Sequence, residues 1–398
     1  MWRERQKPPL NSQLIGRVGR LRLEFFSTHN TGCINRLIAK AIDSWGVDDM
    51  EAVATPIYRE HQTVHMFPVH GLCHGASSRL RRLSEVVCSR RCTSTARSLL
   101  VLQSIPESDD AAAYDRVFTS CPQLQVLHLI SCHYSGDMVV DAPRSDIREL
   151  VVDKCAFAAI CLRALPNLES LVSLGTRVFF ESTSFPCLRQ CNLALCLGVK
   201  EEGLRQYFAR LLKLKLSLFF RHTPDIASLI IRFTGPDRWI TPPTFTSSLL
   251  PNLRRLLVAD LPSSWDVSWP RLLLEMAPSL ETFHIHIAPP SIEDEPGDMD
   301  EIPWQPTVLR HHQLKEFVMV GFEGKGRQVY LVKFVMGVCT AMNHAALFKK
   351  GYVRDKGHWD WEMATQPQPW TDDEKNNTLN KIMDGVSSST ASVQLVFG

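Results

Sequence analysis

A short apolar phrase recurs along the chain and constrains its fold more than any other feature. Each copy has a lead-in that often ends in proline, then an apolar residue, two variable residues, an apolar residue, one variable residue and another apolar residue. Seven copies occur, in Cys121–Cys132, Ser145–Cys155, Phe185–Leu193, Thr223–Phe233, Leu250–Leu261, Ala277–Ile287 and His311–Phe322. Weaker copies occur in Arg17–Phe25, Leu80–Leu83 and Leu168–Leu171. We therefore expect a stack of similar units.

The spacing of the copies indicates the type of unit. The leading apolar residues follow one another at 23, 21 and 20 residues in the series Leu124, Ile147, Leu168, Leu188, and at 27 and 27 in the series Ile226, Leu253, Leu280. These periods lie in the range of about 20–29 residues that is typical of leucine-rich repeats. The second and third apolar positions alternate with polar ones, as in a strand with one buried face. The sequence therefore predicts an α/β leucine-rich-repeat solenoid, with a curved parallel sheet backed by helical or irregular return segments.

The longer return segments are predicted to be helices. Ala111–Ser120 places apolar residues on one side, Glu201–Leu214 has acidic residues in its first turn, and Trp269–Met276 has proline in its first turn. Pro289–Pro306 is rich in acidic residues and proline, which favours a solvated loop. Cys132 and Cys155 follow strands, in the inward-facing slot where such repeats place Asn or Cys, and we expect them to be buried.

The repeat phase stops after Phe322, and a different pattern follows. We expect a helix in Arg327–Thr340, a strand in Ala345–Tyr352, a helix from the capping box Thr371–Glu374 to Met383, and a closing strand in Val393–Phe397. This gives three regions: a short N-terminal extension (1–14), the solenoid (15–322) and a C-terminal α/β cap (323–398). The tryptophans Trp359, Trp361 and Trp370 are expected either to anchor a partner or to pack the cap onto the last repeat.

Composition excludes several classes of protein. The 398 residues carry 44 Lys and Arg against 42 Asp and Glu, a formal charge of +2, which argues against a dedicated nucleic-acid binder. No apolar run approaches the roughly 20 residues of a membrane helix, and residues 1–14 have no apolar signal-peptide core, so we expect a cytoplasmic and/or nuclear protein. Its 12 cysteines are then better interpreted as small buried side chains than as a disulfide framework.

The C-terminal region points to a family. The proline-led repeats and Gly321–Val353 resemble the leucine-rich and FBD-type regions of plant F-box proteins, especially the large set found in grasses, and the tail from Trp359 resembles the C-terminus of that set. The resemblance covers the chain from about Arg17 onward. It implies the substrate-receptor part of a cullin-type ubiquitin ligase, in which an F-box binds a Skp-type adaptor and the repeats bind the target. Since only residues 1–14 precede Ile15, we expect no F-box here.

The sequence does not predict an enzyme. It has no G-x-S-x-G, phosphate-loop or H-E-x-x-H motif, and we expect no cofactor and no metal. His284 and His286 flank Ile285 on one side of a predicted strand and could begin a metal site, but a polar sheet face is the simpler interpretation. Cys187, Cys191 and Cys196, like Cys88 and Cys92, lack C-x-x-C spacing.

We expect the concave sheet face to bind a protein partner, because its outward positions vary between repeats. The candidate partner-binding residues are His128, Asp153, Arg232, Arg255, His284, His286 and Glu316. Three functions remain open: an interaction scaffold without an adaptor, a ligase substrate receptor that binds its adaptor through another surface or as a longer gene product, and a nucleic-acid binder using the arginine-rich stretch Arg79–Arg97. For that stretch a solvated face is the simpler interpretation, because no aromatic residues are interleaved with the arginines.

Overall fold

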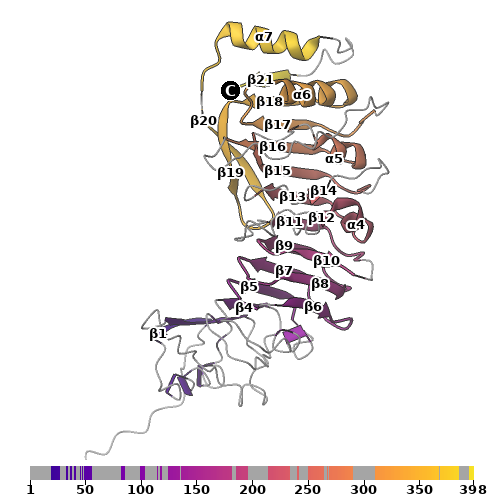
Figure 1. The fold of residues 1–398 in the computed structure, drawn as a ribbon. Helices are drawn as coiled ribbons and strands as arrows, with labels where there is room; N and C mark the ends of the chain where they lie inside the picture. The colour runs from indigo at the N-terminus through magenta and orange to yellow at the C-terminus, as the bar shows by residue number, and fades with distance from the viewer. Residues whose placement is uncertain are drawn as a thin grey trace, which may run out of the picture.

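The computed structural model describes a solenoid built on one long parallel sheet (Figure 1). The described residues are 19–26, 49–55, 82–85, 99–103, 124–134, 136–181, 185–195, 214–233, 240–241, 250–263, 269–289, 310–366, 368–384 and 394–398, with isolated positions between 33 and 118 and at 267. Within them the main sheet has 14 strands, all parallel, in the order β1 (Arg20–Phe26), β2 (Asp49–Thr55), β3 (Arg82–Glu85), β4 (Leu99–Gln103), β5 (Val126–Ile130), β7 (Glu149–Asp153), β9 (Ser170–Leu174), β11 (Gln190–Leu195), β13 (Ser228–Phe233), β15 (Arg255–Pro262), β16 (Thr282–Ala288), β17 (Glu316–Val320), β18 (His344–Phe348) and β21 (Gln394–Phe397). The expected parallel-sheet repeat fold is confirmed.

The apolar phrase sets the register of the sheet. Its second apolar position forms one continuous row of paired residues, which includes Leu127, Leu150, Leu171, Cys191, Leu229, Leu256, Phe283 and Phe317. These side chains are buried in the core cluster. Because the units repeat, each strand adds the same two core rows, and the apolar face of one strand is completed by its neighbours.

The return segments cover one face of the sheet in two ways. Helices α4 (Leu216–Arg221), α5 (Arg271–Met276) and α6 (Gly326–Val338) lie on this side, and short strands β12 (Leu214–Lys215) and β14 (Ile240–Thr241) pair beside them (Figure 1). Between β5 and β11 the returns are strands instead, and they form a second parallel sheet of β6 (Asp137–Asp141), β8 (Ala159–Ala164) and β10 (Val178–Phe180). The expected helical or irregular returns are replaced here by regular strands, because repeats of 20–23 residues leave too little chain for a helix.

Two predicted helices lie mostly outside the described residues. Glu201–Leu214 is described only at Leu214, which belongs to β12, and Ala111–Ser120 is described as helical at three positions, Tyr114, Val117 and Phe118. The third predicted helix is α5, with Pro270 as its N-cap residue. Beyond Pro289, the acidic loop to Pro306 is outside the described residues, as are most of the Arg79–Arg97 stretch and Cys88, Cys92 and Cys196. The repeat pattern did not predict β2 and β4.

The two cysteines predicted to be buried lie in neighbouring repeats. Cys132 and Cys155 follow Ser131 and Lys154, whose positive φ angles of 51° and 53° turn the chain inward at the end of each strand. The thiol of Cys132 donates to the carbonyl oxygen of Leu102, and the thiol of Cys155 donates to that of Leu129, at 3.4 and 3.3 Å. The cysteines therefore satisfy backbone carbonyls between adjacent units, which is a structural role.

The C-terminal region extends the same sheet. Helix α6 packs into the core, β18 pairs with β17, and β21 pairs with β18. Helix α7 (Asp372–Met383) lies over the end of the stack (Figure 1), and Thr371 caps it as predicted, because its hydroxyl accepts a hydrogen bond from the Glu374 amide at 3.2 Å. Trp370 packs against Phe322 and Phe397 beneath it.

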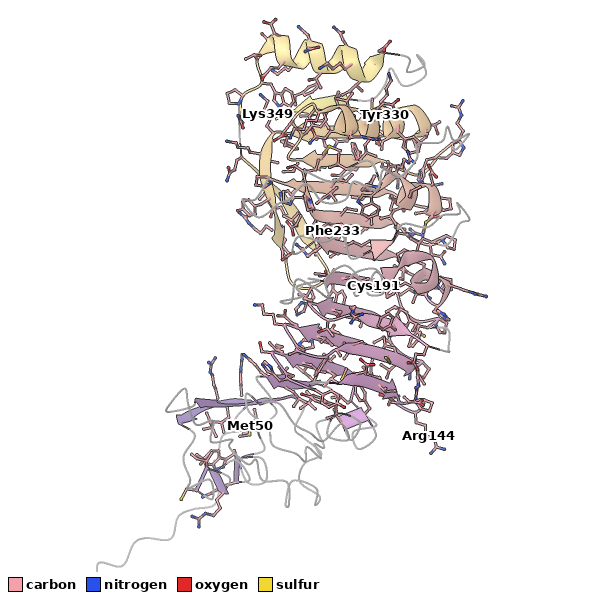
Figure 2. All side chains as sticks on the ribbon, in the orientation of Figure 1. Met50, Arg144, Cys191, Phe233, Tyr330 and Lys349 are labelled. Atoms are coloured by element: carbon pink, nitrogen blue, oxygen red, sulfur yellow. The ribbon has the colours of Figure 1, made fainter. Side chains whose placement is uncertain are left out.

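One predicted strand, Ala345–Tyr352, is wrong in its extent. The chain leaves the sheet after Phe348 and continues as β19 (Lys350–Asp355), which pairs antiparallel with β20 (Trp361–Gln366). Lys349 marks this departure, below α7 (Figure 2), where its ammonium lies 2.9 Å from the carboxylate of Glu374. The resulting hairpin runs along the sheet face that the helices leave open (Figure 1).

Candidate functional site

All seven candidate residues lie on the sheet face opposite the helices, which we call the hairpin face. The parallel register places His128, Val151, Val172, Asn192, Ile230, Leu257, His284, Val318 and Ala346 in its middle row. Arg255 and Glu316 lie in the row toward the strand starts, and Asp153, Arg232 and His286 lie toward the strand ends. The partner-binding role of these residues stays a prediction.

The hairpin β19–β20 covers much of this face. Its side chains Val353, Trp361 and Met363 pack on two apolar patches, formed by Ile230, Leu257 and Ala259 and by Val318, Val320 and Ala346. The approach is close at Gly351, where an added Cβ would lie 2.8 Å from Cγ1 of Val320 and 2.6 Å from the Ala364 oxygen. Much of the sheet face that we expected to bind a partner is therefore occupied by the chain itself.

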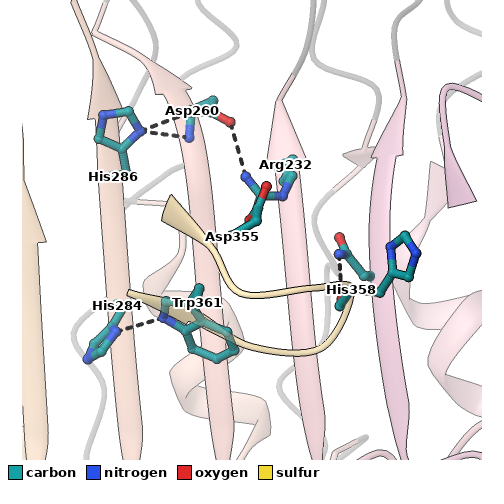
Figure 3. A network of polar contacts seen from close by, with 8 residues as sticks. Arg232, Asp260, His284, His286, Asp355, His358 and Trp361 are labelled. Atoms are coloured by element: carbon teal, nitrogen blue, oxygen red, sulfur yellow. Dashed lines mark hydrogen bonds and ion pairs between the residues drawn. The ribbon is translucent and has the colours of Figure 1, made fainter. Parts of the chain in front are cut away.

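Trp361 is the central contact of the hairpin. Its side chain is buried, and its indole Nε1 donates a hydrogen bond to Nδ1 of His284 at 2.9 Å (Figure 3). Since Nδ1 accepts, the ring proton of neutral His284 is on Nε2, which lies 3.3 Å from the carboxylate of Glu316. The nearby His284 ring lowers the pKa of Glu316. The guanidinium of Arg255 lies 4.4 Å from the centre of the indole ring, in cation–π geometry.

Two arginines of the sheet pair with carboxylates of the hairpin. Arg232 pairs with Asp355, and Arg255 donates to Asp360 at 2.5 Å. The hydrogen bond from Arg255 holds the pKa of Asp360 below its usual value. Arg232 itself is largely buried, with 12% of its side chain exposed, so the hairpin also shields a cation from water.

A bulge in β15 builds a second polar contact beside Arg232. The register between β15 and β16 shifts at Asp260, which has a positive φ of 58°. This turns the Asp260 carboxylate toward Nδ1 of His286 at 2.9 Å and toward Arg232 at 3.7 Å (Figure 3). His286 is nearly buried and has a carboxylate partner, which fits a structural role for this histidine.

The turn of the hairpin reaches the middle of the solenoid. Asn192 donates from Nδ2 to the backbone oxygen of His358 at 2.8 Å, and the ring of His358 meets that of His128 edge-on, with centroids 5.8 Å apart. His128 Nε2 lies 2.7 Å from the carboxylate of Glu149. The hydrogen bond from His128 lowers the pKa of Glu149, with a further contribution from Trp359.

Asp153, the seventh candidate, is half-buried at the end of β7, level with Ile130 and Leu174 in the neighbouring strands. The structure thus brings five of the candidates to the hairpin or its direct contacts: His128, Arg232, Arg255, His284 and Glu316. His286 joins them through Asp260 and Arg232. Sequence reasoning named Trp359 and Trp361 of the hairpin, as a partner anchor or as packing for the cap, but it did not select Asn192, Asp260, Asp355 or Asp360. A turn signal existed in Asp355-Lys-Gly357, between two segments of alternating polarity.

The histidine pair does not extend to a metal site in the described residues, where no group of three or more His, Cys, Asp or Glu side chains is placed to hold an ion. Among the thiols, Cys191 lies in the core, where burial raises its pKa. None of the helices in the described part of the chain has the length and apolarity needed to span a lipid bilayer. Compared with models of known protein families and with curated proteins, the chain has no match to either.

Proposed function

We propose that this protein is a protein-interaction scaffold, with the hairpin face of the solenoid as its binding surface. One observation carries the proposal. The core row stays apolar along the whole stack, whereas the middle row of the hairpin face carries the polar side chains His128, Asn192 and His284 among its apolar ones. Side chains that packing does not require to be alike are free to be specific for a partner.

The resemblance of the repeats and of Gly321–Val353 to plant F-box proteins supports a finer proposal. By that resemblance, the scaffold corresponds to the target-binding part of a cullin-type ubiquitin ligase receptor, and it acts by holding a protein rather than by catalysis. A ligase receptor that also binds a Skp-type adaptor, through a surface other than an F-box, is the alternative. The two proposals differ in one measurable property, which is adaptor binding.

The adaptor question is tested by co-elution. The purified chain is mixed with a plant Skp-type adaptor, and a protein with a complete F-box serves as the positive control. We expect the control to co-elute with the adaptor and this chain to elute alone. Stable co-elution of the chain would favour the ligase-receptor alternative.

The binding face is tested by site-specific photo-crosslinking. A photoreactive phenylalanine analogue replaces Gln190 on the hairpin face or Arg163 on β8 of the second sheet, as a matched control position. We expect a protein partner that is crosslinked from position 190 and not from position 163. Equal crosslinking from both positions, or crosslinking from 163 alone, would contradict the proposed surface.

A further inference from the structure

We propose that the hairpin β19–β20 is an internal ligand of the hairpin face, and that the partner presents an acidic, tryptophan-containing segment that replaces it. This inference rests on the proposed function, because it names the class of partner for the same surface. The binding face is then closed in the free protein, and the partner must compete with residues 350–366.

The first argument is chemical complementarity at three separate points. The sheet presents Arg232, Arg255 and the acceptor nitrogen of His284, and the hairpin meets them with Asp355, Asp360 and the indole N–H of Trp361. Each of these three groups of the face has a matching group on the hairpin. A segment that takes the place of the hairpin has to supply the same groups, since otherwise Arg232 and Arg255 would each lose a carboxylate and Nδ1 of His284 would lose its donor.

The second argument concerns how the hairpin is held. Its strands pair with each other in a sheet of their own, so no ladder of backbone hydrogen bonds ties them to the solenoid within the described residues. Its carboxylates are exposed, at 56% for Asp355 and 53% for Asp360, and such ion pairs are screened by water and salt. The attachment of the hairpin to the sheet therefore depends mainly on the apolar contacts of Val353, Trp361 and Met363. A hairpin attached only through side chains can leave the sheet without disrupting the hydrogen bonds between the strands of the solenoid.

The third argument defines the partner segment more closely. The adjacent residues Asp360 and Trp361 both engage Arg255, one through its carboxylate and the other through its ring. Because His284 accepts a hydrogen bond from the ring, tryptophan fits this position and phenylalanine does not. We therefore expect an Asp-Trp pair in the partner, with a second carboxylate placed to meet Arg232.

The test measures binding of a fluorescein-labelled peptide with the sequence of residues 350–366 to the full-length chain by fluorescence polarisation. In the wild type, the tethered hairpin competes at high effective concentration, and binding should be weak. The variant Trp361→Ala removes the central anchor of the tethered hairpin, and we expect it to bind the peptide about tenfold more tightly or better. The variant Asp355→Asn/Asp360→Asn, which keeps all apolar contacts and so guards against misfolding, should shift affinity in the same direction.

Three controls make the result specific. Tyr352→Ala removes an exposed aromatic ring from the same hairpin and should leave peptide affinity at the wild-type value. A peptide carrying Asn at both aspartates and Ala at Trp361 should not bind any variant. Adding Arg255→Ala to the Trp361→Ala chain should abolish the gain in affinity.

Amide exchange of residues 350–366 reports release of the hairpin independently. The proposal is overturned if the released variants bind the peptide no more tightly than the wild type, or if the hairpin amides stay as protected in both variants as in the wild type. The proposed function is judged separately, since a partner crosslinked from position 190 would stand even if the peptide fails. Conversely, if the peptide binds but no partner is crosslinked from position 190, the hairpin only shields the sheet face, and the scaffold proposal is contradicted.

Discussion

Gly321 offers a sharp test of how closely the last repeats are packed. It follows β17 with a positive φ of 83°, and a Cβ added there would lie 2.2 Å from the backbone oxygen of Ile287 in β16. A non-glycine residue in this backbone region costs about 1–2 kcal/mol. Relieving the clash moves one strand relative to the next, at about 1–3 kcal/mol for an overpacked site. We expect Gly321→Ala to lower the free energy of unfolding by about 2–5 kcal/mol.

Gly175 supplies the matched control, because it has a similar φ of 94° but no described atom within 4 Å of the position that an added Cβ would take. Gly175→Ala should therefore lower the free energy of unfolding only by the backbone conformational cost, about 1–2 kcal/mol. Urea unfolding followed by circular dichroism measures both, and amide exchange of β16 and β17 shows whether the loss is local to the clash. Equal stability of the two variants would refute the assignment of the larger effect to the contact with Ile287.

Three further predictions follow from single side chains. Thr371→Ala should destabilise α7 by about 1 kcal/mol in urea unfolding, and Thr371→Ser, which keeps the hydroxyl that accepts from the Glu374 amide, should not. Burial lowers the pKa of His311, so the folded state binds fewer protons than the unfolded chain; stability should fall as the pH drops below about 6.5, and His311→Asn should flatten this fall between pH 7 and 5. Cys33 is exposed and should be alkylated by iodoacetamide at pH 8, whereas Cys339, whose pKa burial raises to about 12, should react only after unfolding, as mass spectrometry of the digested protein would show.

The repeat phrase predicted most strands of the main sheet, though not β2 and β4, because alternation along a strand is a local property. His284 and His286 share a face for the same reason that Phe283 and Ile285 share the core. The capping box at Thr371 and the apolar spacing of α6 were equally local, and both helices are present. By contrast, the strands β6, β8 and β10 were not predicted, because segments as short as Asp137–Asp141 are stabilised by pairing with the neighbouring repeats more than by their own sequence.

The position of the hairpin could not be predicted from local sequence patterns. A strand at Ala345–Tyr352 was predicted, but nothing in its alternation indicates that the chain leaves the sheet at Lys349 and turns back over it. Asp355 is a charged residue and Trp361 an aromatic one, in a stretch with several tryptophans. The sequence of that stretch does not indicate which residues of the sheet they contact. The candidate residues of the sheet were thus identified without the groups that meet them.

Neighbouring residues in the chain are enough to account for the stacked parallel sheet, its core rows and the set of side chains that share the hairpin face. All of these depend on residues a few positions apart, repeated at intervals of 20–27 residues over most of the stack. What covers that face, by contrast, depends on contacts between distant segments. The pairs that close it, Arg232 with Asp355, Arg255 with Asp360 and His284 with Trp361, join residues separated by 123, 105 and 77 positions. No local pattern encodes such pairs, because they form only once the stacked strands have set the distance and direction at which the returning chain meets them.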